Sequence, residues 1–241
     1  MKVSAILTIT LSLLDTFVHA AFAAEGEKNM SSALSPKQQA IVPIAAFTAV
    51  GDTDGLKNAL NEGLGRGLTI NEIKEVLVQL YAYAGFPRSL NALDCFSQVL
   101  KERQTQGITD ETGREAGPLP AGKTNLELGT EVQTKLVGAP VEGGLMDFAP
   151  AVDYFLKAHL FGDIFGRDNL DWQSREIATV SALANIDGAD GQFRSHCNIS
   201  LNVGLAPEQL KELAAVLGSK VSKPVGERAA RSLDEVLSSR S

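Results

Sequence analysis

The sequence predicts an all-α protein made of two similar halves. Apolar residues recur every three or four positions along most of the chain, and several of these stretches begin with helix-capping residues. No stretch alternates between apolar and polar residues as a half-buried strand does. With 241 residues, of which 44% are hydrophobic, the chain is long enough for one large core or two smaller ones.

Capping residues mark the start of the first predicted helix. Ser35 suits the N-cap, Pro36 the first helical position, and Gln38 completes a capping box. The apolar run that follows is expected to kink at Pro43, because proline removes a helical hydrogen bond. A turn over residues 51–55 ends this helix.

Further helices complete the first half. The pattern predicts a helix over residues 56–66 and another that begins at a second capping box, Thr69 to Glu72. Glycine and proline within residues 85–87 break that helix, and a last helix is predicted over residues 89–103.

The middle of the chain is predicted to be irregular. Residues 104–125 mix glycine, proline and charged residues as linkers do, and further turn residues extend the irregular stretch to about residue 150. A helix is expected over residues 151–161, and Asp171 is expected to cap the helix after it.

Glu176 and His196 each lie on an otherwise apolar face of a predicted helix. Glu176 shares its face with Val180, and His196 shares its face with Phe193. A tight turn over residues 187–191 makes the two helices antiparallel, so these faces can meet. A carboxylate beside an imidazole can act as a general acid and base, and a buried structural hydrogen bond between the helices is the alternative interpretation.

The two halves align with each other at a nearly constant offset of 136 or 137 residues. The unit is too long for a solenoid repeat, so we interpret it as a duplicated domain. The aligned residues include Leu34 with Leu170, Gly67 with Gly204, Glu75 with Glu212, Leu80 with Leu217, and Pro87 with Pro224.

The alignment sets the candidate pair apart. Ala40 corresponds to Glu176, and Ala59 corresponds to His196, so both polar positions are alanine in the first half. A matched pair of differences indicates that the two side chains touch or act together. The first half is then a scaffold, and the second half holds the site.

The N-terminal residues have the pattern of a secretory signal. Lys2 precedes an apolar run over residues 5–14, and small residues follow. Cleavage after Ala23 gives a signal peptide of residues 1–23, with Ala20 as a second possible site and a retained anchor as the alternative. The mature protein is expected to be secreted or periplasmic, with no membrane span after signal removal, because the run is too short for a transmembrane helix.

The net charge and the histidines and cysteines of the chain indicate which kinds of ligand are not expected. The formal net charge is -7 and no basic cluster is present, so nucleic acid is not an expected partner. His159 and His196 are scattered and have no acidic cluster at ligand spacing, so neither a metal nor a cofactor is expected. Cys95 and Cys197 could form a disulfide after export or could be small core residues.

Several segments resemble the carboxymuconolactone decarboxylase family, whose fold is shared with alkylhydroperoxidase D. In the first half these are LSPKQQAIVPIAA, ALNEGLGRGLTINEIKEVLVQLYAYAGFP and SLNAL; in the second they are LDWQSREIATVSALANIDG and RSHCNISLNVGLAPEQLKEL. The resemblance implies two tandem domains of that all-helical fold, over residues 34–103 and 126–238, with residues 104–125 as the linker.

The resemblance also implies an assembly, a chemistry and a site. Family members assemble into rings, so a tandem chain is expected to self-associate as a trimer with pseudo-sixfold symmetry. The decarboxylases act on a small lactone acid by proton transfer, and Glu176 and His196 match the family's glutamate and histidine. The Cys-x-x-Cys pair of the peroxidase branch is absent, since this chain has Ala189 to Gln192 there.

Other residues are weaker candidates for substrate binding. In the family an aromatic segment helps to wall the site, so Tyr81, Tyr83 and Arg88 could contribute from the first half. Arg175 and Arg194 flank the candidate pair, and either guanidinium could bind a substrate carboxylate.

Three functional hypotheses follow. The first is an exported carboxymuconolactone decarboxylase-like enzyme that uses Glu176 and His196 on a small organic acid or lactone. The second is a thiol-dependent hydroperoxide reductase, a peroxiredoxin-like activity that would use Cys95 and Cys197. The third is a non-enzymatic binding or assembly protein, with Glu176 and His196 bonded only to each other in a closed pocket.

Overall fold

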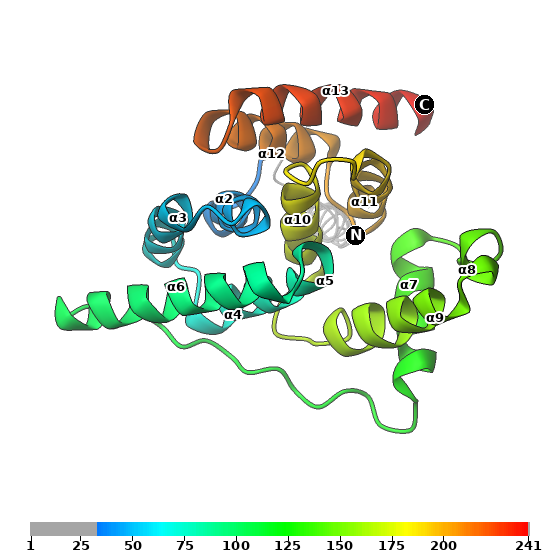
Figure 1. Ribbon diagram of the computed structural model, residues 1–241, viewed down its shortest axis with the longest axis horizontal. Helices are drawn as coiled ribbons and strands as arrows, with labels where there is room; N and C mark the ends of the chain where they lie inside the picture. The colour runs from blue at the N-terminus through cyan, green and yellow to red at the C-terminus, as the bar shows by residue number, and fades with distance from the viewer. Residues whose placement is uncertain (1–32, 241) are drawn as a thin grey trace, which may run out of the picture. The chain divides into compact units, whose positions relative to one another are not determined.

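The all-α prediction is confirmed in the computed structural model, which describes residues 33–240 (Figure 1). These residues form helices and contain no strand. The predicted signal peptide, residues 1–23, lies outside the described residues. None of the described helices is long and apolar enough to cross a membrane.

The helices of the first half are α2 (Pro36–Val50), α3 (Thr53–Gly65), α4 (Ile70–Gln79), α5 (Tyr81–Ala84) and α6 (Phe86–Thr105). Those of the remaining chain are α7 (Asn125–Val137), α8 (Leu145–Phe148), α9 (Pro150–Tyr154), the π-helix η1 (Phe155–Ile164), α10 (Trp172–Leu183), α11 (Asp190–Asn202), α12 (Pro207–Lys220) and α13 (Lys223–Arg240).

The predicted caps are confirmed where they were expected. Ser35 and Thr69 each accept from the backbone of the third residue of their helix, and that residue's side chain accepts from the cap in return. Asp171 caps α10 through the backbone N–H and the hydroxyl of Ser174. Helix α2 runs through Pro43 without interruption. Helix α3 begins three residues earlier than predicted, because Asp52 caps it.

The prediction of an irregular chain up to about residue 150 is wrong. Helix α7 begins at a capping box formed by Thr124 and Glu127, a signal present in the sequence. It packs closely along η1, and a Cβ added at Gly129 would overlap the carbonyl oxygen of Lys157. The predicted helix over residues 151–161 is instead the short α9 followed by the wider π-helix η1.

The duplication is visible in the order and packing of the helices. Helices α2, α3, α4 and α6 have α10, α11, α12 and α13 as their counterparts, and the two central helices, α2 and α10, pack against each other. Side chains from both halves form one apolar core, in which Ile41, Ile44 and Ile177 are almost completely buried. Burying each such side chain stabilises the fold by about 1.5–3 kcal/mol.

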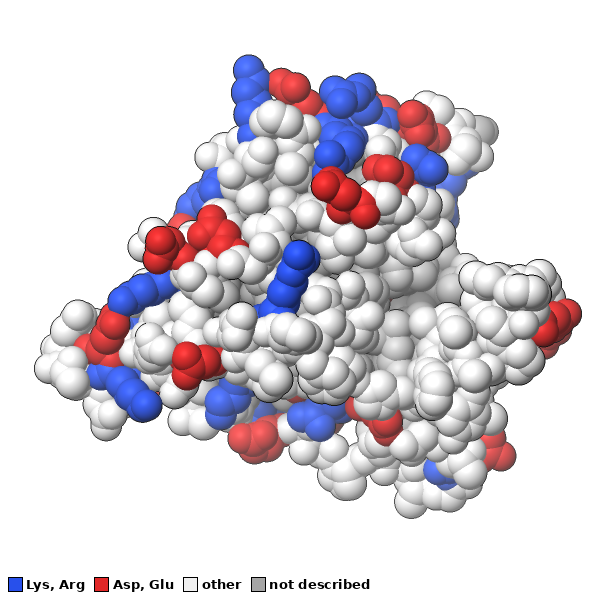
Figure 2. Space-filling view, in the orientation of Figure 1, with Lys and Arg blue, Asp and Glu red and all other residues white. Residues whose placement is uncertain are grey.

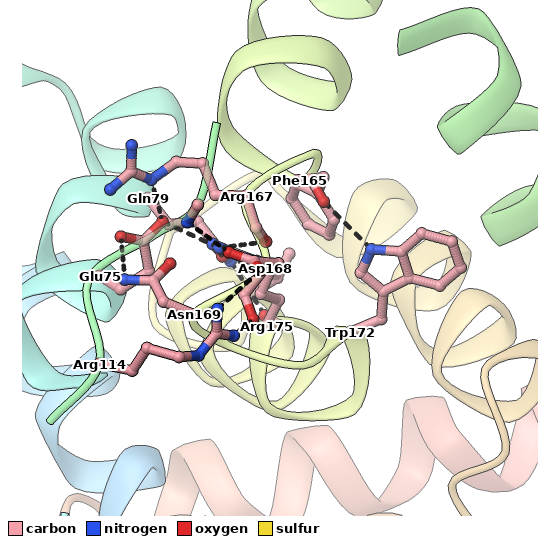
Figure 3. A network of polar contacts seen from close by, with 11 residues as sticks. Glu75, Gln79, Arg114, Phe165, Arg167, Asp168, Asn169, Trp172 and Arg175 are labelled. Atoms are coloured by element: carbon pink, nitrogen blue, oxygen red, sulfur yellow. Dashed lines mark hydrogen bonds and ion pairs between the residues drawn. The ribbon is translucent and has the colours of Figure 1, made fainter. Parts of the chain in front are cut away.

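Two aligned glutamates join the halves reciprocally. Glu75 on α4 accepts from Arg175 on α10 at 2.8 Å, and Glu212 on α12 accepts from Gln39 on α2 at 2.8 Å. Arg175 and Gln39 are aligned positions, so the contact is repeated with the halves exchanged. Arg167 adds a second guanidinium at 2.7 Å from Glu75, as Figure 3 shows.

The contact at Glu75 is an ion pair between its carboxylate and two arginine side chains. Burial by itself would raise the pKa of Glu75, but the hydrogen bonds from Arg167 and Arg175 outweigh burial and lower the pKa. Glu75 is therefore a carboxylate at neutral pH, and it anchors the interface between the halves.

A second, smaller apolar cluster lies between α7 and η1. Phe161, Phe165 and Leu136 are buried in it, and Tyr81 and Tyr83 of α5 pack against it. Helix α5 therefore extends from the first half toward this part of the second.

Candidate functional site

Glu176 and His196 meet in the interior, as the helix faces predicted. Glu176 lies in the second turn of α10 and His196 in the second turn of α11, and these two helices pack against each other. His196 Nδ1 lies 2.8 Å from Glu176 Oε2, a hydrogen bond in which the carboxylate accepts. The Glu176 side chain is fully buried, and the His196 side chain is 12% exposed.

One oxygen of the Glu176 carboxylate has no hydrogen-bond partner. Oε2 bonds to His196, but Oε1 is buried and no described donor reaches it. Buried polar atoms are nearly always paired in folded proteins, and an unpaired one needs an explanation. If the pair were purely structural, the free-energy cost of burying Oε1 without a hydrogen bond would not be offset. A ligand that donates a hydrogen bond to Oε1 would offset it.

Tyr83 is the residue of the first half that the structure brings to this pair. Its ring meets the His196 ring edge-on, with 5.7 Å between the ring centroids and an angle of 82°. The Tyr83 hydroxyl is also buried, with Thr179 beside it, and none of the described groups makes a hydrogen bond of ordinary geometry with it. Burial, followed by the negative charge of Glu176, raises the pKa of Tyr83 strongly, so the hydroxyl keeps its proton.

The structure places Arg175 in the core rather than at an open substrate site. Its side chain is fully buried, and its guanidinium donates to Glu75, to Gln79 and to the carbonyl of Arg167 (Figure 3). The sequence could not reveal this partner, because Glu75 belongs to the other half. Arg175 therefore holds the two halves together and is not placed to bind a substrate carboxylate.

The other two arginines are also placed away from a clear substrate role. Arg88 donates to the carbonyl of Ala49, near the end of α2. Arg194 is exposed on α11 and lies 3.8 Å from Glu235 of α13. Neither contact involves Glu176 or His196, so substrate binding by these arginines stays a prediction without structural support.

The two cysteines are free and do not form a disulfide with each other. Cys197 is buried in the core, and burial, with the charge of Glu176, raises the pKa of its thiol to about 12. Cys95 is partly buried on α6, and burial raises the pKa of this thiol too. Low-pKa thiolates are what thiol peroxidases need, and neither residue has that environment.

A second histidine–carboxylate pair, which was not predicted from the sequence, lies on η1. His159 Nδ1 lies 2.6 Å from Asp163 Oδ2 on η1, and the His159 ring packs 5.6 Å from that of Tyr81. The spacing of four residues was the available signal. Both side chains are substantially exposed, unlike the Glu176–His196 pair, and no cluster of three metal-ligating side chains occurs within residues 33–240.

The first half has a hollow at the position that corresponds to the pair. It has a volume of about 170 Å³ and is lined by Ala59, the counterpart of His196, and by Lys220, the counterpart of Tyr83. Lys220 makes an ion pair with Glu62 there, at 2.5 Å. Lys220 of the second half thus lines the hollow in the first half, and the aligned Tyr83 of the first half packs against His196 in the second.

Other hollows lie along α7 and α10. Two adjoining ones, of about 460 and 420 Å³, share Lys135, Asp171 and Trp172. On the face drawn in Figure 2, the surface is also hollowed between the part that carries α8 and α9 and the part that carries α11. The atoms around that hollow belong mainly to uncharged residues.

Comparisons with known proteins agree with this architecture. Residues 14–98 and 150–235 each match the carboxymuconolactone decarboxylase family. A 4-carboxymuconolactone decarboxylase of Acinetobacter baylyi is 28% identical over 115 residues, which cover 47% of this chain and 84% of that protein. An uncharacterized protein of Methanocaldococcus jannaschii is 32% identical over 66 residues, 27% of this chain and 62% of that protein.

The two matched regions fall on the two helical repeats, and the second contains both Glu176 and His196. Together the regions span well over half of the chain. The chain therefore belongs to the carboxymuconolactone decarboxylase family, as a tandem duplication of its helical domain.

Proposed function

We propose that this chain is a carboxymuconolactone decarboxylase-like enzyme that acts on a small acidic or lactone metabolite. The observation that carries the proposal is the buried Glu176–His196 pair with its unpartnered Glu176 oxygen. The relative from Acinetobacter baylyi is named for 4-carboxymuconolactone, which makes that compound the first substrate to test.

The pair suits the proton transfer that decarboxylation of a lactone acid requires. The bond between the ring carbon and the carboxylate breaks, carbon dioxide leaves, and the electron pair moves into the conjugated lactone carbonyl. The resulting carbanion equivalent then takes up a proton. His196 would supply that proton, while Glu176 holds Nδ1 and stabilises the charged imidazole. Solvent restores the proton to His196.

The test compares single substitutions in purified protein. Release of carbon dioxide from 4-carboxymuconolactone is measured for the wild type, His196→Ala and Glu176→Gln. Loss of general acid–base catalysis is expected to slow turnover by about 10²–10⁴-fold. Ser195→Ala, an exposed change on α11 next to His196, is the control and should keep near-normal turnover. Full activity in both site variants would refute the proposal.

The substrate class can be tested apart from turnover by thermal shift. A panel of small organic acids and lactones is screened, including muconolactone, which lacks the scissile carboxyl group. A bound ligand at 100 times its dissociation constant stabilises the native state by about 2.7 kcal/mol. A shift that is present in the wild type and absent in His196→Ala would support the proposed site.

A binding or assembly protein is the second candidate, and one observation favours it. The His196 ring and the Glu176 carboxylate hydrogen-bond only to each other among the described residues, and both are nearly enclosed. This candidate predicts a stable fold, no turnover of any lactone acid, and no ligand-induced thermal shift.

A thiol-dependent hydroperoxide reductase is less well supported, because the pKa of each thiol is raised. Peroxide consumption with a thiol reductant should therefore be unchanged in a Cys95→Ser, Cys197→Ser double variant. Loss of a measurable wild-type peroxidase activity in that variant would revive this hypothesis.

We further propose that the protein is exported and self-associates. Export is supported by the pattern of residues 1–23 alone, and N-terminal sequencing of the mature protein tests it. Self-association is supported by an exposed apolar surface on α8, α9 and the start of η1. Its residues are Leu145, Phe148, Val152, Tyr154 and Phe155.

Light scattering tests the assembly. A trimer mass is expected for the wild type, and a lower mass is expected for Phe148→Ser combined with Phe155→Ser. A monomeric wild type at micromolar concentration would contradict self-association.

A further inference from the structure

Two buried polar atoms at the candidate site, one from each half of the chain, make no hydrogen bond of ordinary geometry with the described residues. One is the acceptor Glu176 Oε1, on α10 of the second half, and the other is the Tyr83 hydroxyl, on α5 of the first. Thr179 lies beside the Tyr83 hydroxyl and acts to lower its pKa, as a donor to the tyrosine oxygen does. The proton of the Tyr83 hydroxyl and the Glu176 oxygen therefore both stay available to a third group.

Tyr83 lies beside the candidate pair. Its ring packs edge-on against the His196 ring, and His196 is hydrogen-bonded to Glu176. The negative charge of Glu176 contributes to the raised pKa of the Tyr83 hydroxyl. The hydroxyl keeps its proton throughout the neutral range, so it can donate a hydrogen bond to a nearby oxygen.

A ligand oxygen beside Glu176 needs such a donor. Negative charge develops on the lactone carbonyl oxygen as carbon dioxide leaves, and a buried carboxylate close by opposes that charge. A neutral, fixed O–H that points at the oxygen offsets this repulsion without adding a proton that could be lost.

We propose that the Tyr83 hydroxyl of the first domain is the hydrogen-bond donor that binds an acceptor oxygen of the ligand, a lactone carbonyl or carboxylate, beside Glu176 and His196 of the second. The inference rests on the proposed function and deepens it. The first domain is then more than a scaffold, because it supplies a catalytic residue. In the first half the residue aligned with Tyr83 is Lys220, which makes an ion pair with Glu62 beside Ala59. Of the two described repeats, only the second therefore has the complete set of polar groups.

The experiment uses Tyr83→Phe, which removes the hydroxyl and keeps the ring against His196. Tyr81→Phe is the matched control. Tyr81 lies on the same short helix, but its ring stacks on Phe86 and contacts His159 instead of His196, so the structure gives it no role at the Glu176–His196 pair. Binding of muconolactone is measured by calorimetry, and the melting temperature is measured without ligand.

In Tyr83→Phe the dissociation constant for muconolactone should rise about tenfold, the equivalent of one hydrogen bond of roughly 1.4 kcal/mol. The ligand-free melting temperature should be unchanged or higher, because a buried hydroxyl without a partner is removed. Turnover of 4-carboxymuconolactone should show both a higher KM and a lower kcat, because the hydrogen bond forms in the bound substrate and strengthens as negative charge develops. Tyr81→Phe should match the wild type in all three measurements.

Each contrary outcome has a distinct meaning. Equal affinity in Tyr83→Phe and wild type overturns this inference and leaves the proposed function standing. A lower ligand-free melting temperature in Tyr83→Phe also overturns it, because the hydroxyl then has a partner within the protein or in a buried water. If the wild type binds no lactone acid and turns none over, the proposed function fails, and this inference fails with it.

Discussion

The first and second halves of the chain have the same order of helices, but two aligned positions that are alanine in the first half are charged or polar in the second. In the second half α10 holds a carboxylate and α11 holds an imidazole, and Tyr83 from the other half packs against the imidazole ring. In the first half the same place has alanines, and a surface ion pair between Lys220 and Glu62 covers it. A duplicated fold can therefore keep its packing while only one copy carries a buried site.

The reciprocal glutamates extend the comparison to the interface between the halves. Glu75 faces two guanidinium groups, one of them fully buried, whereas Glu212 faces the Gln39 amide and the backbone N–H of Leu34. The geometry is shared, but only one of the two contacts is ionic.

Removing the ionic contact should have the largest effect on stability. Glu75→Ala leaves Arg175 buried and unpaired, so the free energy of unfolding should fall by about 3–5 kcal/mol. Glu212→Ala removes hydrogen bonds from two neutral donors and should cost about 1–2 kcal/mol. Urea denaturation measures both, and equal losses would show that the ionic character of the first contact does not matter.

The same contact predicts a dependence on pH. Because the pKa of Glu75 is lowered in the folded protein, its stabilisation is complete above the ordinary carboxyl pKa and is lost as the pH falls through the lowered value. The difference in unfolding free energy between wild type and Glu75→Ala should therefore shrink below about pH 4. A difference that stays constant down to pH 2 would contradict this assignment.

Replacing the candidate pair by apolar residues should have a smaller effect of opposite sign. Buried polar pairs exchanged for apolar residues of similar volume often leave stability unchanged or raise it by about 1–4 kcal/mol. We expect Glu176→Leu combined with His196→Phe to unfold at equal or higher urea concentration while losing all ligand binding. A loss of stability of several kcal/mol would assign the pair a structural role.

The surface ion pair of the first half should have the smallest effect. Both Lys220 and Glu62 are about one-third or more exposed, so Lys220→Ala should lower the unfolding free energy by less than about 1 kcal/mol. Added salt should reduce the difference further. A larger loss in the urea measurement would mean that the covering residue is important for packing in both halves.

Local signals in the sequence predicted much of the fold. Capping residues located the starts of α2, α4 and α10, and the repeat predicted two helical domains. The α7 helix was missed although Thr124 and Glu127 form a capping box, because glycines and prolines on both sides suggested an irregular chain. Helical periodicity also placed Glu176 and His196 on faces that could meet, and they do.

The sequence by itself determined the helices, the duplication and the position of the polar pair, because each depends on residues within a few turns of one another or on a fixed offset. Only the tertiary structure decided which side chains of one half enter the other. Arg175 points to Glu75 rather than to a substrate, and Tyr83 reaches His196. These contacts join residues about a hundred positions apart, and their geometry depends on how the central helices pack, which no local pattern encodes.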